Sequence, residues 1–407
     1  MKQRIFLALG FITMCAITAF ATGEAVHGVN YSFAIFTTIS IVFAALIIGW
    51  ATEAAQFYIS QGLALAILAW MQTLPEFAVE AVLAWNQERE LMIANFTGSL
   101  RLFAGVGYPL VFFTACISHY IKTKEIKKEI IFDHEHWVEV LSFIPPLTYF
   151  LFIYVKGSLS VLDGIILISF YAIYLFLLSR ISPKDEEETE DLAFVARTIV
   201  KMKPRNRNVS IVLLFFIGGG IIFFVAHPFI EGMKMLAFSF GVSSFVFIQW
   251  FAPFVSEFPE KITAFNWARK VKKAPIGIMN FISSSVNQWT VLTGMLPMIY
   301  NISLGRLEPL QLTMLQKNEI LLTIVQGILA FLLLIELRLT FYGTAVLFIL
   351  WFIQFIYSSI HSEITLVYLV FILIEVIKIS YRRKMPAAFY GAAKASLLGS
   401  DSSTPLK

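Results

Sequence analysis

The sequence contains little charge and almost no cysteine. Of its 407 residues, 14% are charged and 58% are hydrophobic, whereas a soluble domain has about 25% charged residues. The two cysteines, Cys15 and Cys116, are too far apart in the sequence to indicate a disulfide framework or a metal site. The sequence contains no recognisable nucleophile–base pair and no cluster of metal ligands. We therefore predict that the protein is not an enzyme and holds no cofactor.

Basic residues and histidines do not suggest a nucleic-acid partner or a catalytic site. The net charge of +4 is modest and lies in loops, so it reports membrane topology rather than nucleic-acid binding. The histidines form no metal-binding motif and fall in or near expected loops, so we expect them at the surface: His27, His119, His134, His136, His227 and His361.

Long apolar runs dominate the rest of the chain. Most are ~18–25 residues long, enough for a helix to cross the ~30 Å hydrocarbon core of a bilayer. The pattern predicts an all-α, polytopic membrane protein with about 12 transmembrane helices. We expect spans near 4–22, 31–55, 62–86, 91–118, 137–156, 159–180, 209–233, 240–268, 275–302, 317–338, 340–358 and 363–381.

Lysine and arginine gather in alternate loops. The basic side receives the start of the chain and the loops near 122–128, 180–207, 269–273, 338 and 382–384. Because basic loops stay in the cytoplasm, we predict that both termini are cytoplasmic and that the protein lies in the cell membrane, in contact with lipid. The first apolar segment also resembles a signal peptide, so a cleaved leader is an alternative to an extra helix.

A polar, mixed-charge segment divides the chain into two halves. Each half has five core spans, so the two must insert with opposite orientations, as in the inverted repeats of many secondary transporters. The boundaries that we predict, in order, are an extra N-terminal helix, a first repeat, a cytoplasmic linker, a second repeat, and an extra C-terminal helix with a cytoplasmic tail: 1–25, 26–181, 182–208, 209–360 and 361–407.

Each half carries a Pro-Glu pair inside an apolar run. The first half reads "TLPEFAVEAVLAW" and then "MIANFTGSLRLF"; the second reads "SEFPEKITAFNWARK" and then "GIMNFISSSVNQW". Glu76 precedes Asn95 by 19 residues, and Glu260 precedes Asn280 by 20. The two halves therefore repeat one pattern, in which a mid-helix Pro-Glu is followed by an Asn-Phe and small hydroxyl residues.

This pattern predicts an ion site. A proline inside a helix removes a backbone donor and frees carbonyl groups upstream, which is tolerable in a membrane where they line a cavity. A carboxylate at the same depth should face the bundle interior. Carboxylate, carbonyl, hydroxyl and amide oxygens suit Ca²⁺ or Na⁺ better than zinc.

The paired motifs resemble the two α-repeats of the sodium/calcium exchanger family of cation antiporters. The resemblance implies that the motif glutamates bind Ca²⁺ and that hydroxyls and carbonyls at the kinks serve Na⁺. Carried over by position, the implied ligands are Thr73, Glu76, Asn95 and Ser99 in the first repeat, and Ser256, Glu260, Asn280, Ser283 and Ser284 in the second.

Several positions depart from the family motif. Gln72 and Glu257 replace a threonine and a serine, and Phe103 stands where an amide or carboxylate ligand would be. In the second repeat that ligand is Gln288 or Asn287. Glu257 lies three residues before Glu260 on one helix face, and two carboxylates this close suit proton exchange.

Two charged residues near the first motif leave alternatives open. Glu80, one turn after Glu76, is either a second carboxylate of the ion pathway or a polar group reaching the headgroups. Arg101 either pairs with a carboxylate, standing in for a cation, or extends to a membrane interface.

The function that we predict is secondary antiport by alternating access. Ca²⁺ or a related cation would be exchanged for Na⁺ or H⁺, so inorganic cations are the expected partners. One alternative is a monovalent Na⁺/H⁺ antiporter on the same scaffold, which Phe103 and Glu257 favour. Another is a degenerate family member that does not transport.

Overall fold

The computed structural model describes residues 31–55, 61–180, 192–382 and 384–400, and these are overwhelmingly helical. The prediction of an all-α, polytopic fold is confirmed. The helix expected at 4–22, Cys15 and His27 lie outside the described residues. Within those residues, seven helical segments are long and apolar enough to cross a membrane: Tyr31–Ala55, Arg89–Thr123, His134–Lys156, Val161–Leu178, Pro204–Ser239, Met314–Leu334 and Ser358–Tyr381.

Two of the expected spans are each broken in two, at the motif prolines. The first consists of α3 (Gln61–Gln72) and α4 (Leu74–Trp85), and the second of α12 (Ser244–Ser256) and α13 (Phe258–Arg269). The breaks fall at Thr73 and Glu257, each two residues before a motif proline. Because proline is tolerated in the first turn of a helix but not in its interior, a new helix starts at each motif.

The spans that follow the motifs share a second irregularity. The first continues from α5 (Arg89–Leu102) through a π-helical turn, η2 (Phe103–Gly107), into α6 (Tyr108–Thr123). The second continues from α14 (Ala274–Asn287) through the π-helical turn η5 (Gln288–Leu292) into α15 (Thr293–Leu304). Such turns are rare and often occur at functional sites. Each begins eight residues after the motif asparagine, so the backbone identifies Gln288, not Asn287, as the counterpart of Phe103.

Apart from α10, which lies in the expected linker, the other helices follow the expected spans to within about six residues. A further helix, α19, lies in the expected C-terminal tail. These helices are α2 (Tyr31–Ala55), α7 (Trp137–Leu141), α8 (Ile144–Lys156), α9 (Val161–Leu178), α10 (Phe194–Val200), α11 (Pro204–Ser239), α16 (Met314–Leu334), α17 (Phe341–Ile356), α18 (His361–Tyr381) and α19 (Ala387–Ser400), with 3₁₀ turns η3 (His134–His136) and η6 (Ser358–Ile360).

The described residues form two compact units. Unit 1 takes those that lie within Met1–Ser99, Lys184–Ile262 and Met295–Glu308, and unit 2 takes those within Leu100–Pro183, Thr263–Gly294 and Pro309–Lys407. Each unit takes segments from both halves of the chain. The predicted domain boundaries therefore describe order along the sequence, not compact bodies, and they stay a prediction.

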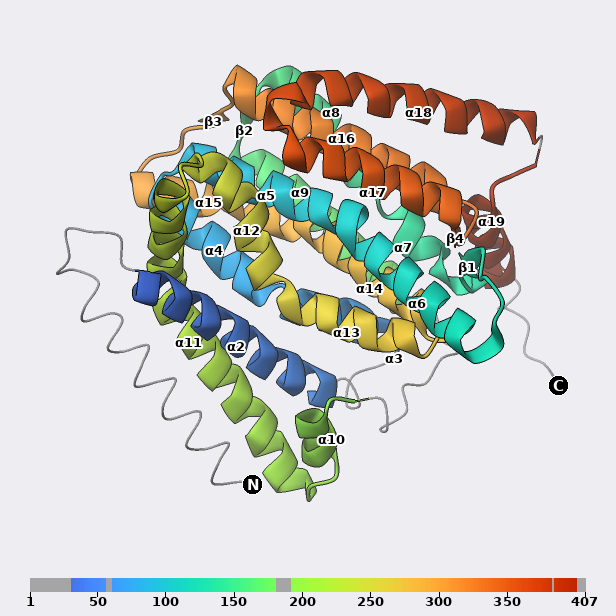
Figure 1. The fold of residues 1–407 in the computed structure, drawn as a ribbon, viewed down its shortest axis with the longest axis horizontal. Helices are drawn as coiled ribbons and strands as arrows, with labels where there is room; N and C mark the ends of the chain where they lie inside the picture. Colours follow the sequence, from blue (N-terminus) through green and yellow to red (C-terminus); the bar gives the residue numbers. More distant parts are fainter. Residues whose placement is uncertain (1–30, 56–60, 181–191, 383, 401–407) are drawn as a thin grey trace. The chain divides into compact units, whose positions relative to one another are not determined.

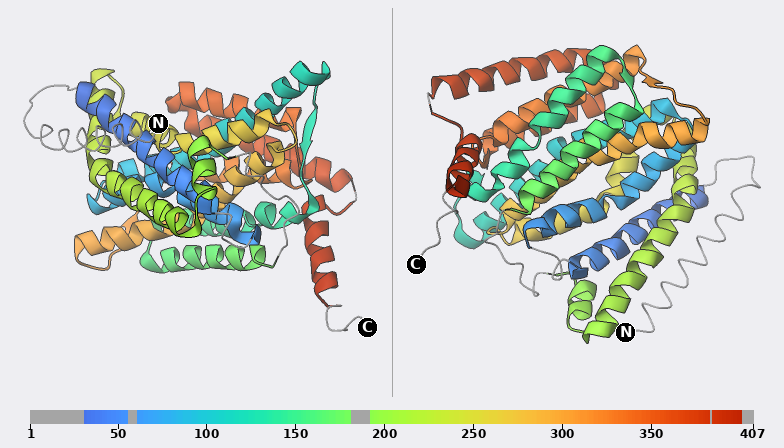
Figure 2. Two further views of the ribbon diagram at one scale, coloured as in Figure 1. Left: turned by 90° about the horizontal axis from the view of Figure 1, so that it is seen from below. Right: turned by 180° about the vertical axis from the view of Figure 1, so that it is seen from behind.

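In unit 1, α2 lies along α11, as all views show (Figures 1 and 2). Small residues permit the close approach, since a Cβ on Gly218 would be 2.7 Å from the Ile48 side chain and one on Gly232 would be 3.0 Å from Ala34. Small residues at helix contacts are the usual device for packing in a membrane, where no hydrophobic force joins the helices.

The linker between the repeats is more ordered than expected. Within 182–208 the structure forms α10, and α11 begins at Pro204 rather than at 209. Leu192, Ala196 and Ile199 are buried against Ala54 of α2, and the Ala193 amide donates to Glu53 Oε2 at 2.9 Å. Ala196 and Ile199 share one apolar face of α10, so the described part of the polar segment packs against α2.

In unit 2, two short antiparallel sheets join loops that are distant in sequence. Strand β1 (Glu129–Ile131) pairs with β4 (Arg338–Thr340), and β2 (Ser158–Leu159) pairs with β3 (Leu310–Gln311). The first pair joins two loops predicted to be cytoplasmic, and the second joins two predicted to lie on the opposite side. The pairing agrees with that assignment, although the direction of insertion stays a prediction.

Substituting Gly98 tests the packing of α5 on α12 in unit 1. A Cβ at this position would lie 1.7 Å from the Gln249 carbonyl oxygen, so we expect Gly98→Ala to destabilise the fold by at least the ~1–3 kcal/mol of an overpacked core. Thermal unfolding in detergent measures the effect. Gly219→Ala is the matched control, because nothing lies within 4 Å of a Cβ there. Equal melting temperatures for the two variants would contradict this packing.

Candidate ion-binding site

The first motif stands where α3 ends and α4 begins. Thr73 and Glu76 are buried, and the Thr73 hydroxyl donates to the Trp70 carbonyl at 2.8 Å. Thr73 thus satisfies an acceptor at the end of α3. Glu76 lies in the first turn of α4, where the N-terminal end of the helix dipole favours a negative charge.

Asn95 joins two carboxylates of α4. Its Nδ2 donates to Glu76 Oε1 at 2.5 Å and to Glu80 Oε1 at 2.9 Å. All three side chains are fully buried, and the two glutamates are neighbours because they are one helical turn apart. Glu80 therefore belongs to the site, and the alternative that it reaches the headgroups is wrong.

The second motif reaches the same cluster. Ser256 Oγ donates to Glu76 Oε2, and Ser99 Oγ donates to Glu257 Oε1. These hydrogen bonds join residues of both motifs within unit 1. Residues beside both helix breaks therefore belong to one cluster. The oxygen cluster, as we call it below, comprises Glu76, Glu80, Asn95, Ser99, Ser256 and Glu257.

Lys261 is the residue of this site that the sequence interpretation missed. Its Nζ lies 2.7 Å from Glu257 Oε2, and both side chains are buried, with 6% and 0% of their surface exposed. The signal was present in the motif "FPEK", where the lysine follows Glu260 and stands four residues after Glu257. Residues at this spacing lie on one helix face.

Two acceptor atoms in the cluster have no partner among the described residues. They are Glu80 Oε2 and Asn95 Oδ1, and both are buried. Buried acceptors are nearly always satisfied, so each exception requires an explanation such as an ion. In the same residues, no three Asp, Glu, His or Cys side chains are grouped closely enough to hold a metal ion by themselves. A cation here would bind at most two carboxylates, with neutral oxygens completing its shell.

The other predicted ligands are buried on matching elements. Glu260 occupies the first turn of α13, as Glu76 does in α4, and is fully buried. The remainder are buried in α14 and the start of η5, in unit 2, where Ser283 Oγ lies 2.8 Å from the Tyr174 hydroxyl. They are Asn280, Ser283, Ser284, Asn287 and Gln288.

Phe103 is a packing residue. It is fully buried, and its ring centroid is 5.5 Å from that of Phe281. An aromatic ring offers no oxygen ligand, so the first repeat contributes no metal ligand at this position.

Arg101 pairs with a carboxylate, as the first alternative holds, but the carboxylate is that of Glu319 and not a motif glutamate. In unit 2 its fully buried guanidinium donates to Glu319 Oε2 at 2.6 Å and to Gln354 Oε1 at 3.0 Å. The other carboxylate oxygen, Glu319 Oε1, lies 2.6 Å from His361 Nδ1. The expectation that His361 is a surface residue is therefore wrong.

His361 completes a buried ionic network. Its Nε2 lies 3.1 Å from the Gln354 carbonyl oxygen, so both ring nitrogens face acceptors. Glu319 therefore has a polar partner at each carboxylate oxygen, and the network joins the C-terminal end of α5, from Leu100 on, to α16 and α18 within unit 2.

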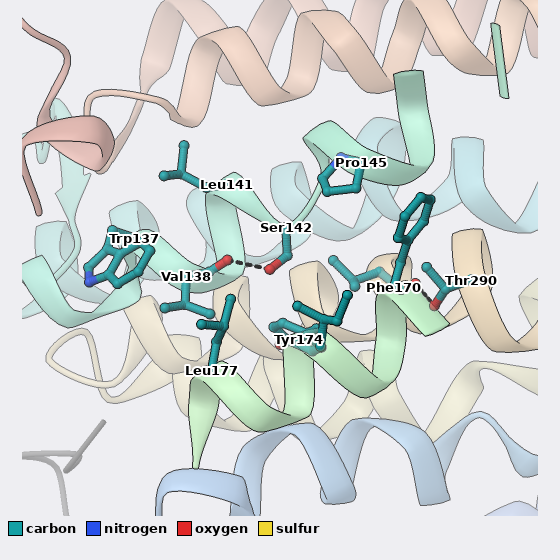
Figure 3. Close-up of a pocket in the computed structure, with 11 residues that line it drawn as sticks. Trp137, Val138, Leu141, Ser142, Pro145, Phe170, Tyr174, Leu177 and Thr290 are labelled. Carbon is teal, nitrogen blue, oxygen red and sulfur yellow. Dashed lines mark hydrogen bonds between the residues drawn. The ribbon is translucent and has the colours of Figure 1, made fainter. Parts of the chain in front are cut away.

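A hollow of about 240 Å³ in unit 2 is not an ion site (Figure 3). Its lining is mainly apolar, and its hydroxyl groups already have protein partners, since the Tyr174 hydroxyl lies 2.8 Å from Ser283 Oγ. Ser142 donates to the Val138 carbonyl at 2.6 Å, and Thr290 donates to the Val286 carbonyl at 2.5 Å.

Breaking the Arg101–Glu319 pair should destabilise the protein. Arg101→Met leaves one carboxylate oxygen of Glu319 without its cation, so we expect a loss of about 3–5 kcal/mol in the free energy of unfolding. Arg306→Gln, which breaks an exposed pair with Glu308, should cost less than about 1 kcal/mol. Unfolding in detergent measures both variants. Equal effects would show that the network adds nothing to stability.

Comparisons with known proteins identify the family. The profile described as sodium/calcium exchanger protein matches residues 29–180 and 210–360. The chain is similar to the crystal structure of the H⁺/Ca²⁺ exchanger CAX, with a TM-score of 0.84 and 28% identity over 96% of this chain and 98% of that one.

Further structures share the fold. The sodium–calcium exchanger NCX_Mj soaked with Na⁺ and Ca²⁺ has a TM-score of 0.52 and 17% identity, over 79% of this chain and 96% of that one. The same exchanger soaked with Na⁺ and Sr²⁺ gives 0.52 and 18%. Comparison with curated protein sequences finds no match. The two-repeat profile covers most of the chain, and the protein therefore belongs to the sodium/calcium exchanger family, a family of integral membrane transporters.

Proposed function

We propose that this chain is a secondary antiporter that exchanges Ca²⁺ for H⁺ by alternating access. The observation that carries the proposal is the oxygen cluster, in which Glu76 and Glu80 share one amide and two acceptor atoms are unsatisfied among the described residues. Carboxylate, amide and hydroxyl oxygens are the ligands that Ca²⁺ prefers. Glu76, Glu80, Asn95 and Ser256 are the ligands that we propose in unit 1.

Coupling follows from charge. A buried carboxylate pair is costly in hydrocarbon, and a divalent cation compensates for it by direct coordination. Protons compensate for the same pair by neutralising it. Either loaded state can therefore change its access from one side to the other, whereas two bare carboxylates resist closure. Exchange results because only the loaded states complete the cycle.

Two considerations favour H⁺ over Na⁺ as the counter-ion. The relative with 28% identity across 96% of the chain is described as an H⁺/Ca²⁺ exchanger. In addition, Glu257 holds the ammonium of Lys261, which competes with any monovalent metal ion at that carboxylate. Na⁺/Ca²⁺ exchange is the alternative. We also propose, from the distribution of basic loops, that both termini are cytoplasmic and that the protein lies in the cell membrane.

A second candidate is a monovalent cation/H⁺ antiporter on the same scaffold. The absence of an oxygen ligand at Phe103 favours it, because a smaller ligand set suits a smaller charge. Protection of Glu76 from a carboxyl-specific reagent separates the candidates. If Ca²⁺ is the transported ion, Ca²⁺ protects Glu76. If the protein is a monovalent antiporter, Na⁺ protects Glu76 and Ca²⁺ does not. A family member that does not transport would give no ion flux.

Glu76→Gln should abolish Ca²⁺ exchange. The amide keeps the shape of the side chain but removes a charge and one acceptor, so we expect uptake to fall by at least ~10-fold, as for lost groups around a metal. Proteoliposomes with an imposed pH gradient measure ⁴⁵Ca²⁺ uptake directly.

The control for this variant is Glu308→Gln, which changes an exposed glutamate in a surface ion pair and should keep wild-type uptake. If Glu76→Gln exchanges Ca²⁺ at the wild-type rate, the proposed site is wrong. If the wild-type protein moves Na⁺ against H⁺ and no Ca²⁺, the second candidate replaces the first.

A further inference from the structure

Lys261 is a buried cation at a position where a helix does not favour one. It lies in the first turn of α13, where the helix dipole stabilises negative charge and opposes positive charge. A lysine within the membrane is also costly. The side chain therefore does not serve the stability of its own helix, and the carboxylate of Glu257 is what compensates for it.

The ammonium is held closely. It lies 2.7 Å from Glu257 Oε2 and 5.7 Å from the centroid of the Phe254 ring, where a cation–π contact forms. Because Lys261 and Glu257 are four residues apart, the side chain cannot move far from the carboxylate. The cation is tethered and is not exchanged with solvent.

Both oxygens of Glu257 are thereby engaged. Oε1 accepts the hydroxyl of Ser99 and Oε2 accepts the ammonium. Glu257 thus has a charged donor, whereas Glu76 and Glu80 accept hydrogen bonds from the neutral side chains of Asn95 and Ser256. A free cation can bind at Glu80 without displacing a charged group, but at Glu257 it must first displace the ammonium.

The pair also acts on the motif carboxylate. Glu76 accepts a hydrogen bond from Ser256, the neighbour of Glu257 in the chain, and Glu257 is paired with Lys261. Glu257 and Lys261 together add no net charge. The extra carboxylate of the second motif, Glu257, is thus offset by Lys261. Each motif is then left with one glutamate, Glu76 in the first and Glu260 in the second.

We propose that Lys261 is a resident cation that decides the counter-ion. Its ammonium takes the place beside Glu257 that a monovalent metal ion would otherwise occupy, so this carboxylate binds no Na⁺ during the cycle. The inference rests on the proposed antiport function and specifies it, because it makes Ca²⁺ exchange independent of Na⁺.

Lys261→Gln tests the proposal. Glutamine keeps much of the length and a donor for Glu257 but removes the charge, and attraction between a carboxylate and a cation at short range is strong. We expect the purified variant to bind ²²Na⁺ at least about tenfold more tightly than the wild type does. In proteoliposomes, Na⁺ should begin to inhibit or drive Ca²⁺ exchange. Lys261→Arg, which keeps the charge, should remain insensitive to Na⁺.

Two further variants, compared with the wild type, make the result decisive. The double variant Glu257→Gln/Lys261→Gln removes both charges and should lose the acquired Na⁺ binding, which a general loosening of the structure would not do. Lys234→Gln is the matched control, since Lys234 is a partly exposed lysine of unit 1 paired with Glu88 and Glu231. It should not bind Na⁺. All variants are compared by their elution in size-exclusion chromatography.

Two outcomes would overturn the proposal. One is Na⁺ binding to the wild type that Glu257→Gln abolishes, a result that does not require the lysine variant to fold. The other is a folded Lys261→Gln protein that binds no more Na⁺ than the wild type. Na⁺ binding and Ca²⁺ exchange are separate readouts, so the two proposals fail separately. A wild type without Ca²⁺ exchange refutes the antiport function alone.

Discussion

The architecture of unit 1 depends on the two hydrogen bonds that Asn95 donates to Glu76 and Glu80. Two carboxylates one helical turn apart repel each other, and in a membrane interior neither water nor headgroups can compensate for them. The amide of Asn95 supplies one donor to each carboxylate, which requires α5 to lie close to α4. Gly98 provides that closeness on the other side, where α5 meets the backbone of α12. The breaks at Thr73 and Glu257 then expose helix starts, whose free N–H groups favour the negative charge.

The two halves of the chain repeat their irregularities as well as their motifs. Each breaks a helix two residues before a Pro-Glu pair, and each starts a π-helical turn eight residues after the motif asparagine. Such features cost stability and persist only where the surrounding structure requires them. Their repetition supports a common origin for the halves even where the side chains differ. At the first residue of the π-helical turns the two halves differ completely. Phe103 packs on an aromatic ring, whereas Gln288 keeps an amide.

Local chemistry in the sequence was sufficient to predict the helix breaks, the spans and the core of the site. Proline fixes where a helix must restart, and a carboxylate within an apolar run must find a polar interior. Contacts between distant residues were not visible. Arg101 and Glu319 are 218 positions apart and His361 lies 42 further on, so no local pattern identifies them as partners. Other omissions had a signal: Leu192, Ala196 and Ile199 have helical spacing inside a polar segment, and Lys261 is adjacent to a motif glutamate.

The buried charges fall into two classes, and under the proposed function the difference separates a stabilising network from an ion site. In unit 2, Glu319 is balanced on both oxygens, by the guanidinium of Arg101 and by the ring of His361, and such a closed network favours one arrangement. In unit 1, Glu76 and Glu80 receive only neutral donors, and acceptor atoms remain unsatisfied among the described residues. A carboxylate paired with a fixed cation has little affinity left for a mobile cation, whereas one that receives only hydrogen bonds from neutral groups can still bind one. Glu257 stands between these classes, because it lies in the oxygen cluster but carries its own cation. Incomplete compensation of charge, rather than the number of carboxylates, therefore determines where a mobile ion can bind.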